Sequence, residues 1–389
     1  MSDVIADLRA CFEASFGAGG RLYFIRAPGR VNLIGEHTDY NEGFVFPMAI
    51  EPEVRVACRP RDDNRVRAVS TAFAGEPEEF VLSGRIERGA AAWGNYCRGV
   101  AAMLLGAGLP LCGMDALISN TLPPGGGLSS SAALEAAFAH ALLTIAGVDI
   151  DAGRLALLCQ RAEHEYAGTP CGIMDQTIVI SGRTGHAMLL DCRDLSRQYV
   201  PLDGQDVRVV IADTKVPRSL AGSEYAVRRK QCEAAVEYFR AGSPHVRSLR
   251  DVTMRQIEEA RGRLDDVLWR RARHVVSENA RTTQAAVLLG RREYEQAGRL
   301  MLQSHASLRD DYQVSCPELD FLVEESMNVK GVYGARMTGG GFGGCMVALV
   351  QPRSVEALNE RLCAAYEAKF GRRPGVFATT ATAGAGRIA

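Results

Sequence analysis

Short apolar runs alternate with stretches of helical periodicity along this chain, and the pattern predicts a mixture of α and β structure. Helices with one buried face are expected wherever apolar side chains recur every three or four residues, at residues 4–16, 93–105, 129–146, 152–167, 223–241, 254–261, 265–289, 293–310, 317–328 and 354–370. Short β-rich runs predict strands at residues 22–27, 44–50, 54–58, 66–69, 80–82, 114–118, 186–191, 198–201, 207–212, 346–350 and 376–382.

The balance of these elements changes near the middle of the chain. Strands are frequent before the Asp203-Gly204 turn, whereas the part that follows the next β run is richer in helix. A chain of 389 residues is long enough for two substantial cores. We therefore expect two domains, residues 1–205 and 206–389.

A glycine- and serine-rich loop, PPGGGLSSSAAL at residues 123–134, leads into the helix expected from residue 129. Such a loop presents unpaired N–H groups and the positive end of the helix dipole, so it can hold an anion. It lacks the lysine of a P-loop, which excludes a Walker-type NTPase. The alternative is a plain turn followed by one capping serine. The helix should carry a one-sided apolar stripe, formed by Leu134, Ala137, Phe138, Ala141, Leu142 and Ile145.

A dense group of hydrogen-bonding side chains lies between the first two expected strands. Within eleven residues the chain carries Arg30, Glu36, His37, Asp39 and Tyr40. This density suits a pocket for a polyhydroxylated ligand better than it suits a core. The alternative is a polar surface loop with local turn bonds.

Three further residues are candidates for chemistry, each with a structural alternative. Asp175 lies among apolar neighbours, so it is either paired with a charge or has a raised pKa, unless it caps a short helix. Glu163 near a helix end is either a metal ligand or a solvated charge. Tyr225 is either a ligand contact or half-buried packing.

A G-x-G-x-x-G match at Gly339, Gly341 and Gly344 calls for comparison with dinucleotide-binding loops. Those glycines follow a strand and open a helix, whereas these precede the β run at 346–350. A dinucleotide-dependent oxidoreductase is therefore rejected. A glycine loop between two strands, where backbone approaches a ligand or another loop, is the better account.

Composition is that of an ordinary soluble globular protein, with 47% hydrophobic and 23% charged residues. A net charge of −1 gives no general attraction to nucleic acid or anionic membrane. The eleven cysteines show neither a CxxC pair nor a cysteine–histidine spacing that would suggest zinc. No apolar run approaches the ~20 residues of a membrane helix, and residues 1–10 do not resemble a targeting signal. We expect a cytoplasmic protein with reduced thiols.

Taken together, these stretches resemble the galactokinase family within the GHMP group of small-molecule kinases. The resemblance rests on six motifs in family order: GRVNLIGEHTDYNEGFVFP (29–47), PPGGGLSSSAALE (123–135), CGIMDQ (171–176), DCR (191–193), SEYAVRRKQCE (223–233) and MTGGGFGGC (337–345). The loop and the last motif are typical of the wider group, and GEHTDY and CGIMDQ narrow it to galactokinase-like sugar kinases. The chain departs at Gly126, where the family often has alanine, and at residues 213–217, where it tends to have small polar residues.

The resemblance implies an α+β fold of two domains, each a mixed or antiparallel sheet packed with helices, with the active site in the cleft between them. It implies transfer of phosphate from ATP to the anomeric hydroxyl of galactose, the first committed step of the Leloir pathway, with Mg²⁺ as cofactor. Asp175 would face that hydroxyl and accept its proton, with Arg30 beside it; a carboxylate next to a guanidinium stays ionised at pH 7.

The remaining roles also come from the resemblance. Sugar contacts are expected from Arg30, Glu36, His37, Thr38, Asp39, Gly172, Asp175 and Tyr225. ATP contacts are expected from Ser70, Gly125, Gly126, Gly127, Leu128, Ser129, Ser130 and Ser131. Ser131 and Glu163 would hold Mg²⁺, a hard cation that prefers oxygen ligands.

Two other functions stay open at this point. One is a kinase for N-acetylgalactosamine or another sugar, because the motifs do not show what the pocket tolerates at C2. The other is a non-catalytic galactose- and ATP-binding sensor, against which the intact set of Arg30, Asp175, Ser131 and Glu163 argues. The expected partners are galactose and ATP only, with no nucleic acid and no membrane, and the expected state is a monomer or weak homodimer.

Overall fold

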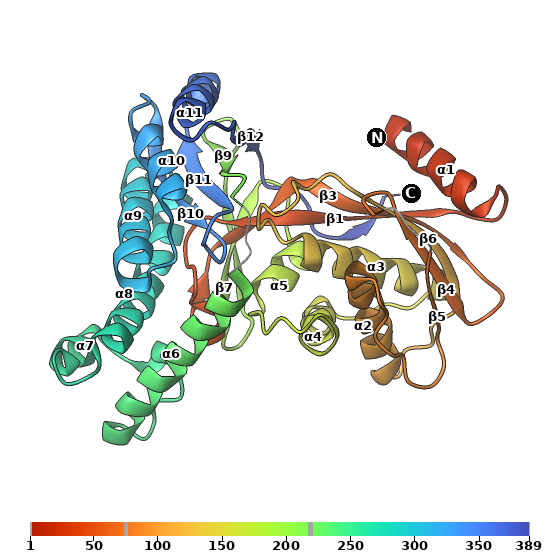
Figure 1. The fold of residues 1–389 in the computed structure, drawn as a ribbon, viewed down its shortest axis with the longest axis horizontal. Helices are drawn as coiled ribbons and strands as arrows, with labels where there is room; N and C mark the ends of the chain where they lie inside the picture. The colour runs from red at the N-terminus through yellow and green to blue at the C-terminus, as the bar shows by residue number, and fades with distance from the viewer. Residues whose placement is uncertain (1, 74–76, 217–220, 389) are drawn as a thin grey trace.

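The computed structural model describes residues 2–73, 77–216 and 221–388, and these form two main sheets, a small third sheet and the helices packed on them (Figure 1). The largest sheet has the strand order β13-β1-β3-β6-β4-β5. Its strands are β1 (Tyr23–Asn32), β3 (Pro47–Pro60), β4 (Arg65–Ser70), β5 (Glu78–Val81), β6 (Met114–Asn120) and β13 (Gly386–Arg387). The β4–β6 pair is parallel and the other pairs are antiparallel, so this sheet is mixed.

Helices cover both faces of the six-stranded sheet. On one face lies α1 (Ser2–Phe16), whose Leu8 and Phe12 pack on Phe24 of β1. On the other lie α2 (Ala92–Gly106), α3 (Ser130–Ala146), α4 (Ala152–Ala162) and α5 (Met174–Ser181) (Figure 1). Apolar residues from this layer and from the sheet form the largest core of the molecule.

The expected one-sided stripe on α3 is wrong. Residues on all sides of this helix are buried, including Ala133, Ala136 and Ala139 outside the stripe, because α3 contacts both the sheet and the neighbouring helices α2, α4 and α5. A helix enclosed on all sides loses the polar face on which the pattern relies. Its alanines allow the close approach to β1 and β3.

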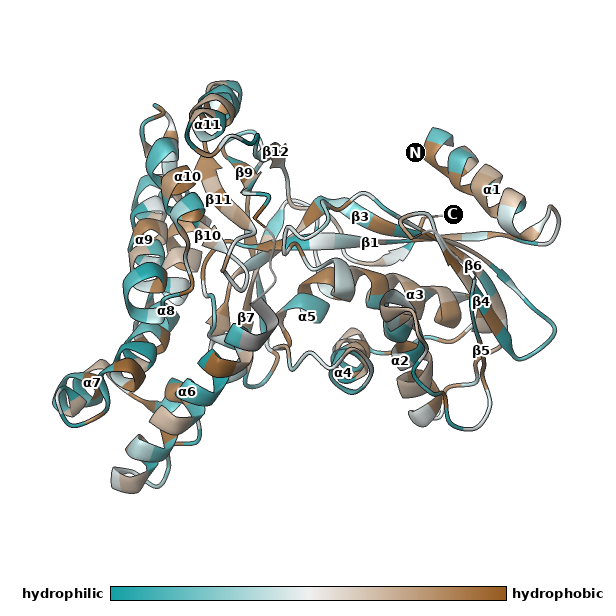
Figure 2. Cartoon of the chain, viewed as in Figure 1, coloured by the Kyte–Doolittle hydropathy of each residue, from teal (hydrophilic) through white to brown (hydrophobic). Residues whose placement is uncertain are grey.

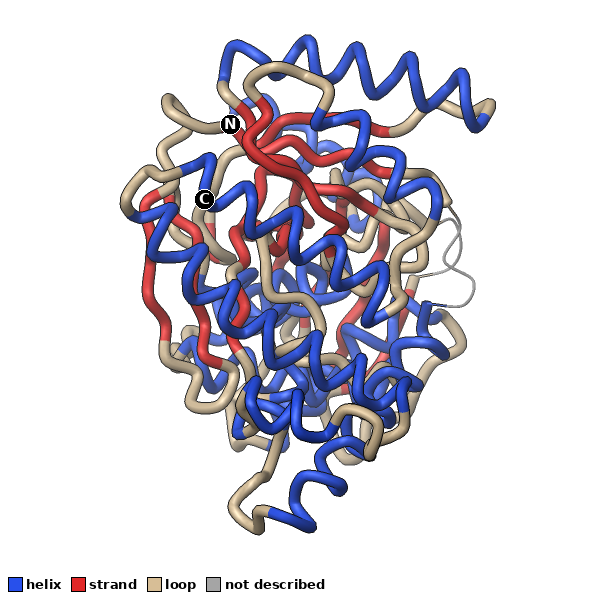
Figure 3. Tube along the Cα trace, turned by 90° about the vertical axis from the view of Figure 1, so that its left-hand side faces the viewer, coloured by secondary structure: helices blue, strands red, loops and turns tan. Residues whose placement is uncertain are grey.

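The second sheet is antiparallel, in the order β10-β11-β9-β12. It comprises β9 (Arg208–Asp213), β10 (Val332–Thr338), β11 (Cys345–Val350) and β12 (Gly375–Thr379). The helices of this half are α6 (Ala221–Gly242), α7 (Met254–Ala260), α8 (Asp266–Gly290), α9 (Tyr294–Ser307), α10 (Pro317–Met327) and α11 (Val355–Phe370). The long helices stand at the outer side of the strands (Figures 2 and 3). Strands β10 and β11 consist largely of hydrophobic residues, whereas α6 and α8 carry many hydrophilic ones (Figure 2).

The two strands expected at 44–50 and 54–58 are wrong, because the chain divides into strands at a different point. Residues 44–45 form β2, which joins β7 (His186–Asp191) and β8 (Arg197–Pro201) in the small third sheet, and residues 47–60 form the single strand β3. Strand β1 pairs with β3 at residues 47–49 and again at 53–58. The irregularity lies between Pro28 and Arg30 of β1, opposite residues 50–52 of β3, where Pro52 has no N–H to give to a ladder.

The C-terminal segment returns to the first sheet: β12 pairs with β9 in the second sheet, and β13, which follows it, pairs with β1. Both termini therefore lie near α1 (Figure 1). Within the described ranges, none of the helices combines the length and the apolar character needed to span a bilayer.

Candidate active site

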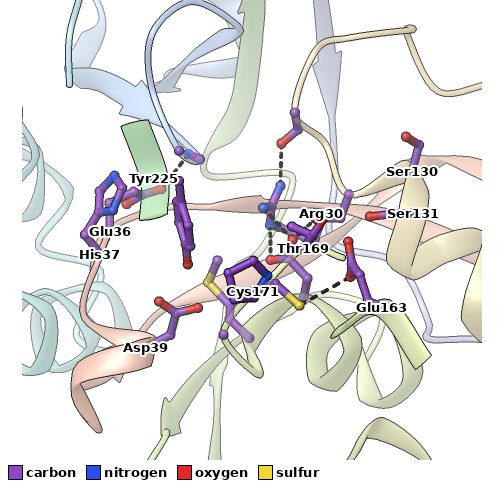
Figure 4. A pocket seen from close by; sticks show the side chains of 18 of the residues that line it. Arg30, Glu36, His37, Asp39, Ser130, Ser131, Glu163, Thr169, Cys171 and Tyr225 are labelled. Carbon is purple, nitrogen blue, oxygen red and sulfur yellow. Dashed lines mark hydrogen bonds and ion pairs between the residues drawn. The ribbon is translucent and has the colours of Figure 1, made fainter. Parts of the chain in front are cut away.

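A cavity of about 410 Å³ lies where the first sheet and its helices meet α6 and the loop after β10. Its lining comprises Arg30, Glu36, His37, Asp39, Gly127, Ser129, Ser130, Ser131, Glu163, Gly168, Thr169, Pro170, Cys171, Gly172, Met174, Asp175, Tyr225, Gly339 and Gly340. Arg30 separates two ends of the cavity, one with Glu36, His37 and Asp39 and the other with Ser130, Ser131 and Glu163 (Figure 4). We call them the signature end and the loop end.

A two-pronged ion pair occupies the middle of the cavity. Arg30, near the end of β1, donates from Nε to Oδ1 of Asp175 and from Nη2 to Oδ2, each at 2.8 Å. The guanidinium side chain is 7% exposed, whereas that of Asp175 is 25% exposed. Fork-to-fork pairs of this kind fix orientation as well as charge. The pair therefore presents part of a rigidly held carboxylate to the cavity.

The sequence left open whether Asp175 caps its helix, and it does not. Ile173 holds the N-cap position of α5, and Asp175 stands in the first turn. A carboxylate there is also stabilised by the positive end of the helix dipole.

The glycine loop is attached to this pair at three points. Arg30 Nη1 donates to the Gly127 carbonyl at 2.6 Å, and the Arg30 backbone N–H donates to the Leu128 carbonyl at 3.1 Å. Ser129 donates from its hydroxyl to Oδ2 of Asp175 at 2.5 Å. The loop, the arginine and the aspartate thus form one hydrogen-bonded unit.

Ser129 stands at the N-cap of α3 without capping it. Its φ of 61° is left-handed, and its side chain makes no capping hydrogen bond because the hydroxyl is directed to Asp175. The plain capping-serine alternative is therefore wrong for this residue. The first-turn N–H groups of α3 are left for another acceptor, as an anion-binding loop requires.

Glu163 lies at the loop end, where α4 changes to a π-helical turn (Glu163–Ala167). Such turns occur often at functional sites. Oε2 of Glu163 accepts from Gln176 Nε2 at 2.7 Å and from the Cys171 thiol at 3.4 Å, and the carboxylate also accepts from Ser131. Burial and the nearby charge of Asp175 raise the pKa of Glu163. A cation at this point would offset that unfavourable field.

The donor set at the loop end fits Mg²⁺. Ser131 and Glu163 supply two oxygens beside the cavity, and Mg²⁺ commonly binds through one or two protein oxygens while keeping water and phosphate ligands. Within residues 2–73, 77–216 and 221–388 no cluster of three or more His, Cys, Asp or Glu residues forms a metal cage.

Glu135 and Gln176 also belong to this end, and the sequence analysis did not single them out. Gln176 Nε2 donates to Oε2 of Glu135 at 3.1 Å as well as to Glu163, and both Glu135 and Gln176 are fully buried. Burial and the charge of Glu163 raise the pKa of Glu135 well above its usual range. Glu135 closes the motif PPGGGLSSSAALE and Gln176 closes CGIMDQ, and that position in each motif was the available signal.

At the signature end, Asp39 packs directly on Gly172. Any side chain at position 172 would collide with the Asp39 carboxylate, which accounts for glycine there. Burial, followed by the charge of Asp175, raises the pKa of Asp39 to about 6. Tyr225, from α6, lines the same region (Figure 4). Asp39, Gly172 and Tyr225 thus come together although they lie far apart in sequence.

Glu36 lines the cavity, but its carboxylate is engaged by the protein. Oε1 accepts from the Thr338 hydroxyl at 3.1 Å and from the Gly339 N–H at 2.9 Å, while Oε2 pairs with Arg336. Arg336 also lies 3.8 Å from Glu278, and all three charged side chains are at most 2% exposed. Burial raises the pKa of Glu36 against the opposing effect of Arg336. This network ties the signature loop to the glycine-rich motif at residues 337–345.

Several expected contacts lie outside the cavity lining. Thr38 is fully buried, with its hydroxyl donated to the Gly35 and Phe44 carbonyls. Ser70 and Leu128 are also buried, and Ser70 accepts from the Ala72 N–H. Gly125 and Gly126 do not line the cavity, whereas Gly127 does.

The chain departs from the family pattern at Gly126 and in the segment that begins at Asp213, and these two places lie beside each other. A Cβ added at Gly126 would meet Cys345 Sγ at 3.4 Å and Asp213 Oδ2 at 3.6 Å, which is ordinary contact. Buried Asp213 pairs with Lys215 at 2.7 Å, so the segment from 213 packs beneath the loop. Pro217, the last residue of that segment, lies outside the described residues.

Comparison with known proteins bears on this cavity and its fold. Residues 10–60 match the galactokinase galactose-binding signature, residues 95–183 the N-terminal domain of GHMP kinases, and residues 285–368 the C-terminal GHMP kinase domain. The chain is 47% identical to a galactokinase of Roseiflexus sp. over 98% of its length and 97% of the relative's, and 48% identical to human galactokinase over 90% and 89%.

Solved structures give the same picture. A Lactococcus lactis galactokinase complexed with galactose superposes with a TM-score of 0.94, 35% identity and coverage of 98% and 99% of the two chains. A Methanococcus jannaschii mevalonate kinase matches with a TM-score of 0.64, 18% identity and coverage of 94% and 100%, which reflects a shared fold alone.

Proposed function

The chain belongs to the galactokinase family of the GHMP kinases and phosphorylates galactose, and we propose that it does so at the anomeric hydroxyl, in the cavity around the Arg30–Asp175 pair. As a GHMP kinase it uses ATP. The observation that carries the proposal is the position of Asp175, a partly exposed carboxylate between the signature end and the loop end. An acceptor at one end and a donor at the other would meet there.

Asp175 orients the hydroxyl and accepts its proton as the sugar oxygen attacks the γ-phosphorus and the bond to ADP breaks. Two N–H groups of Arg30 and the Ser129 hydroxyl donate to this carboxylate and fix its position. Phosphoryl transfer depends mainly on positioning and on electrostatic stabilisation, so a carboxylate fixed in this way meets its main requirement.

The loop end receives ATP. The N–H groups of residues 125–131 would hold its phosphates, and Arg30 would balance charge on the transferred group. Ser131 and Glu163 would hold Mg²⁺, which would supply positive charge to offset that of the phosphates. The support for this pair is that both oxygens adjoin the cavity and each other.

The signature end receives the sugar. Asp39 and His37 offer polar atoms to hydroxyl groups, Gly172 leaves room, and Tyr225 supplies a flat wall. Glu36 lines this end too, and its carboxylate, bonded to Thr338, Gly339 and Arg336, would act by holding the signature loop in place. Thr38 and Ser70 would act by shaping their loops, since their hydroxyls are bonded within the protein.

A coupled ADP-release assay with galactose, N-acetylgalactosamine, glucose, arabinose, mevalonate and homoserine tests the function. We expect galactose to give the highest kcat/KM and a product phosphorylated at the anomeric oxygen, identified by ³¹P coupling. Turnover of N-acetylgalactosamine at a similar kcat/KM would widen the acceptor class. A product phosphorylated at another hydroxyl would overturn the role given to Asp175.

We further infer a division into domains at residues 205 and 206, and a monomer or weak homodimer in solution. Strand β9 opens the second sheet just after that point, which supports the division, although β13 returns to the first sheet. Sedimentation velocity over a hundredfold range of concentration measures the oligomeric state. A stable tetramer would contradict the inferred monomer or weak homodimer.

A further inference from the structure

Glu163, one of the two residues proposed to bind Mg²⁺, has one carboxylate oxygen committed to the protein. Oε2 accepts from Gln176 Nε2 at 2.7 Å and from the Cys171 thiol at 3.4 Å (Figure 4). Both of these donors bond the same oxygen, and neither bonds Oε1. The two oxygens of Glu163 are therefore not equivalent toward a ligand.

Gln176 donates to Glu163 from a position outside the cavity. Its side chain is fully buried and is not part of the cavity lining, whereas that of its neighbour Asp175 is. Gln176 Nε2 also donates to Oε2 of Glu135 at 3.1 Å, and Cys171 Sγ is farther away, at 3.8 Å. An amide nitrogen carries two hydrogens, so each of the two carboxylates can take one of them.

The two acids determine which way the Gln176 amide faces. If the amide were turned over, its oxygen would face the oxygens of Glu135 and Glu163, and these atoms repel one another. In the observed orientation the amide oxygen, Oε1, is buried and has no hydrogen-bond partner within the described residues. A buried oxygen without a partner is unfavourable, so the two bonds to the carboxylates are what hold the amide in place.

Glu135 is the anchor of this arrangement. It is the single acidic residue of α3, a helix made mostly of alanine and other apolar residues, and its side chain is fully buried. Its Oε1 has no hydrogen-bond partner in the part of the chain that the structure describes. Burying a carboxyl group in this way is unfavourable, and an alanine at this position would avoid it. The contact made by the other oxygen, with Gln176, gives this acid a purpose.

The amide joins three helical segments beside the cavity. Glu135 belongs to α3, Glu163 lies where α4 changes to its π-helical turn, and Gln176 belongs to α5. The residue before Gln176 is Asp175, the proposed base. Glu163 and Asp175 are therefore both held by consecutive residues of one helix, which fixes the position of one relative to the other.

We propose that Gln176, held by Glu135, is a positioning residue that occupies Oε2 of Glu163 and leaves Oε1 to bind the cation. This rests on the proposed function in taking Glu163 as a ligand of Mg²⁺. It adds a determinant of metal choice. Mg²⁺ requires near-octahedral geometry, whereas Ca²⁺ is more flexible and accepts one or both oxygens of a carboxylate. A carboxylate restricted to one oxygen should therefore favour Mg²⁺ over Ca²⁺.

Binding of Mn²⁺ with ADP, followed by electron paramagnetic resonance without galactose, measures the metal site independently of turnover. Gln176→Met keeps the length of the side chain but removes the amide. We expect it to weaken Mn²⁺ binding by about tenfold or more, and to narrow the preference for Mn²⁺ over added Ca²⁺ because Oε2 becomes free. An unchanged Mn²⁺ affinity, or an unchanged preference over Ca²⁺, would overturn the inference.

Gln231→Met is the matched control. It removes an amide that accepts from Arg271 at 2.9 Å and does not line the cavity, so Mn²⁺ binding should stay as in the wild type. Thermal melts of both variants separate positioning from packing. A lower melting temperature in Gln176→Met with unchanged metal binding would mean that the amide only stabilises the fold.

Two variants of the anchor test the same point without changing α5. Glu135→Gln keeps an oxygen that can accept from Gln176 and should retain the Mn²⁺ affinity, whereas Glu135→Leu removes the acceptor and should weaken it. Equal affinities in these two variants would contradict the role of Glu135. Failure of the proposed function gives a different result: unchanged Mn²⁺ binding in Glu163→Ala would remove Glu163 from the metal site. A loss in Glu163→Ala without one in Gln176→Met would overturn the positioning role alone.

Discussion

Two arginine–carboxylate pairs lie at the cavity, and the difference between them separates residues that do chemistry from residues that hold the fold. In the Arg30–Asp175 pair the carboxylate side chain is 25% exposed and faces the cavity. In the Arg336–Glu36 pair the side chains are 0% and 2% exposed, and further donors from Thr338 and Gly339 complete the carboxylate's hydrogen bonds. Only Asp175 keeps part of its carboxylate exposed to the cavity. The Arg30–Asp175 pair can therefore act on a ligand, whereas the Arg336–Glu36 pair stabilises the fold.

Arg336, Glu36, Glu278 and Ser304 form a buried group, the Arg336 cluster, and burial explains why it contains a second acid, Glu278. Besides its pair with Glu36, Arg336 donates from Nε to the Ser304 hydroxyl at 3.2 Å, and its Nη2 lies 3.8 Å from Glu278, which accepts from that same hydroxyl. Although burial raises the pKa of Glu278, the charges of Arg281, His274 and Arg336 lower it to about 2. The cluster connects β1, α8, α9 and β10, so it holds the two halves of the site together.

The largest expected effect is on turnover in Asp175→Asn. The amide can still accept a hydrogen bond but cannot take a proton or balance Arg30, so we expect kcat to fall by about 10³-fold or more. The melting temperature should change little because the site is partly open. A variant with full activity would remove Asp175 as the base.

The next largest effect is on stability in Arg336→Met. It leaves Glu36 and Glu278 buried without their cation, and we expect the free energy of unfolding to fall by about 3–5 kcal/mol in urea titration. Arg361→Met, which breaks an exposed pair with Glu325, is the matched control and should cost less than about 1 kcal/mol. Equal losses in both variants would show that the buried cluster is not a scaffold.

Glu163→Ala should raise the Mg²⁺ concentration needed for half-maximal activity by one to two orders of magnitude, on the order of the effect of disturbing a metal's ligand environment. Glu165→Ala removes an exposed neighbour that pairs with Arg161 and should leave the titration unchanged. Binding of Mn²⁺ with ADP, followed by electron paramagnetic resonance, gives a readout independent of activity. An unchanged metal titration in Glu163→Ala would take it out of the metal site.

The pH dependence of galactose KM should report Asp39. Its pKa is raised to about 6, so the carboxyl is ionised above that pH and becomes protonated as the pH falls through it. If the ionised form accepts sugar hydroxyls, KM should rise below pH 6, approaching about tenfold per pH unit. Asp39→Asn should have a higher KM without this dependence. A flat profile in the wild type between pH 5 and 7 would contradict the assignment.

The smallest effect is expected for Gly126→Ala. The φ of Gly126 is not in the left-handed region and an added Cβ fits, so activity should stay within about twofold and stability should rise by about 0.4–1 kcal/mol. Gly127, with a φ of 70°, is the contrast, because alanine there would be strained. A large loss of ATP affinity in Gly126→Ala would mean that the loop does not work through its backbone alone.

Local patterns predicted most of the helices and the glycine loop, since periodicity and turn residues are properties of neighbouring positions. They failed where distant segments decide. The polar face expected on α3 is absent because neighbouring elements enclose the helix, and β3 continues through Pro52 because its partner β1 adjusts the register there.

The candidate site shows the same contrast between features that local sequence indicates and features that depend on packing. The motifs contain Arg30 and Asp175, the resemblance added Glu163, and the structure brings all three to one cavity. The sequence could not show that Ser129 turns its hydroxyl to Asp175. This contact depends on the left-handed backbone of Ser129 and on the ion pair that holds Asp175 to Arg30, 145 residues away in the chain. It also did not show that Gln176 joins Glu135 to Glu163, because that contact exists only once three helical segments have packed.

Calorimetric titration of Asp175→Asn with galactose tests the central claim most directly, namely that Asp175 acts on the acceptor while the rest of the signature end holds it. The account predicts a dissociation constant within about tenfold of the wild-type value, equivalent to about 1.4 kcal/mol, in a protein that releases no ADP. Loss of all measurable galactose binding, with the fold intact, would contradict it and would make holding the sugar the main role of Asp175.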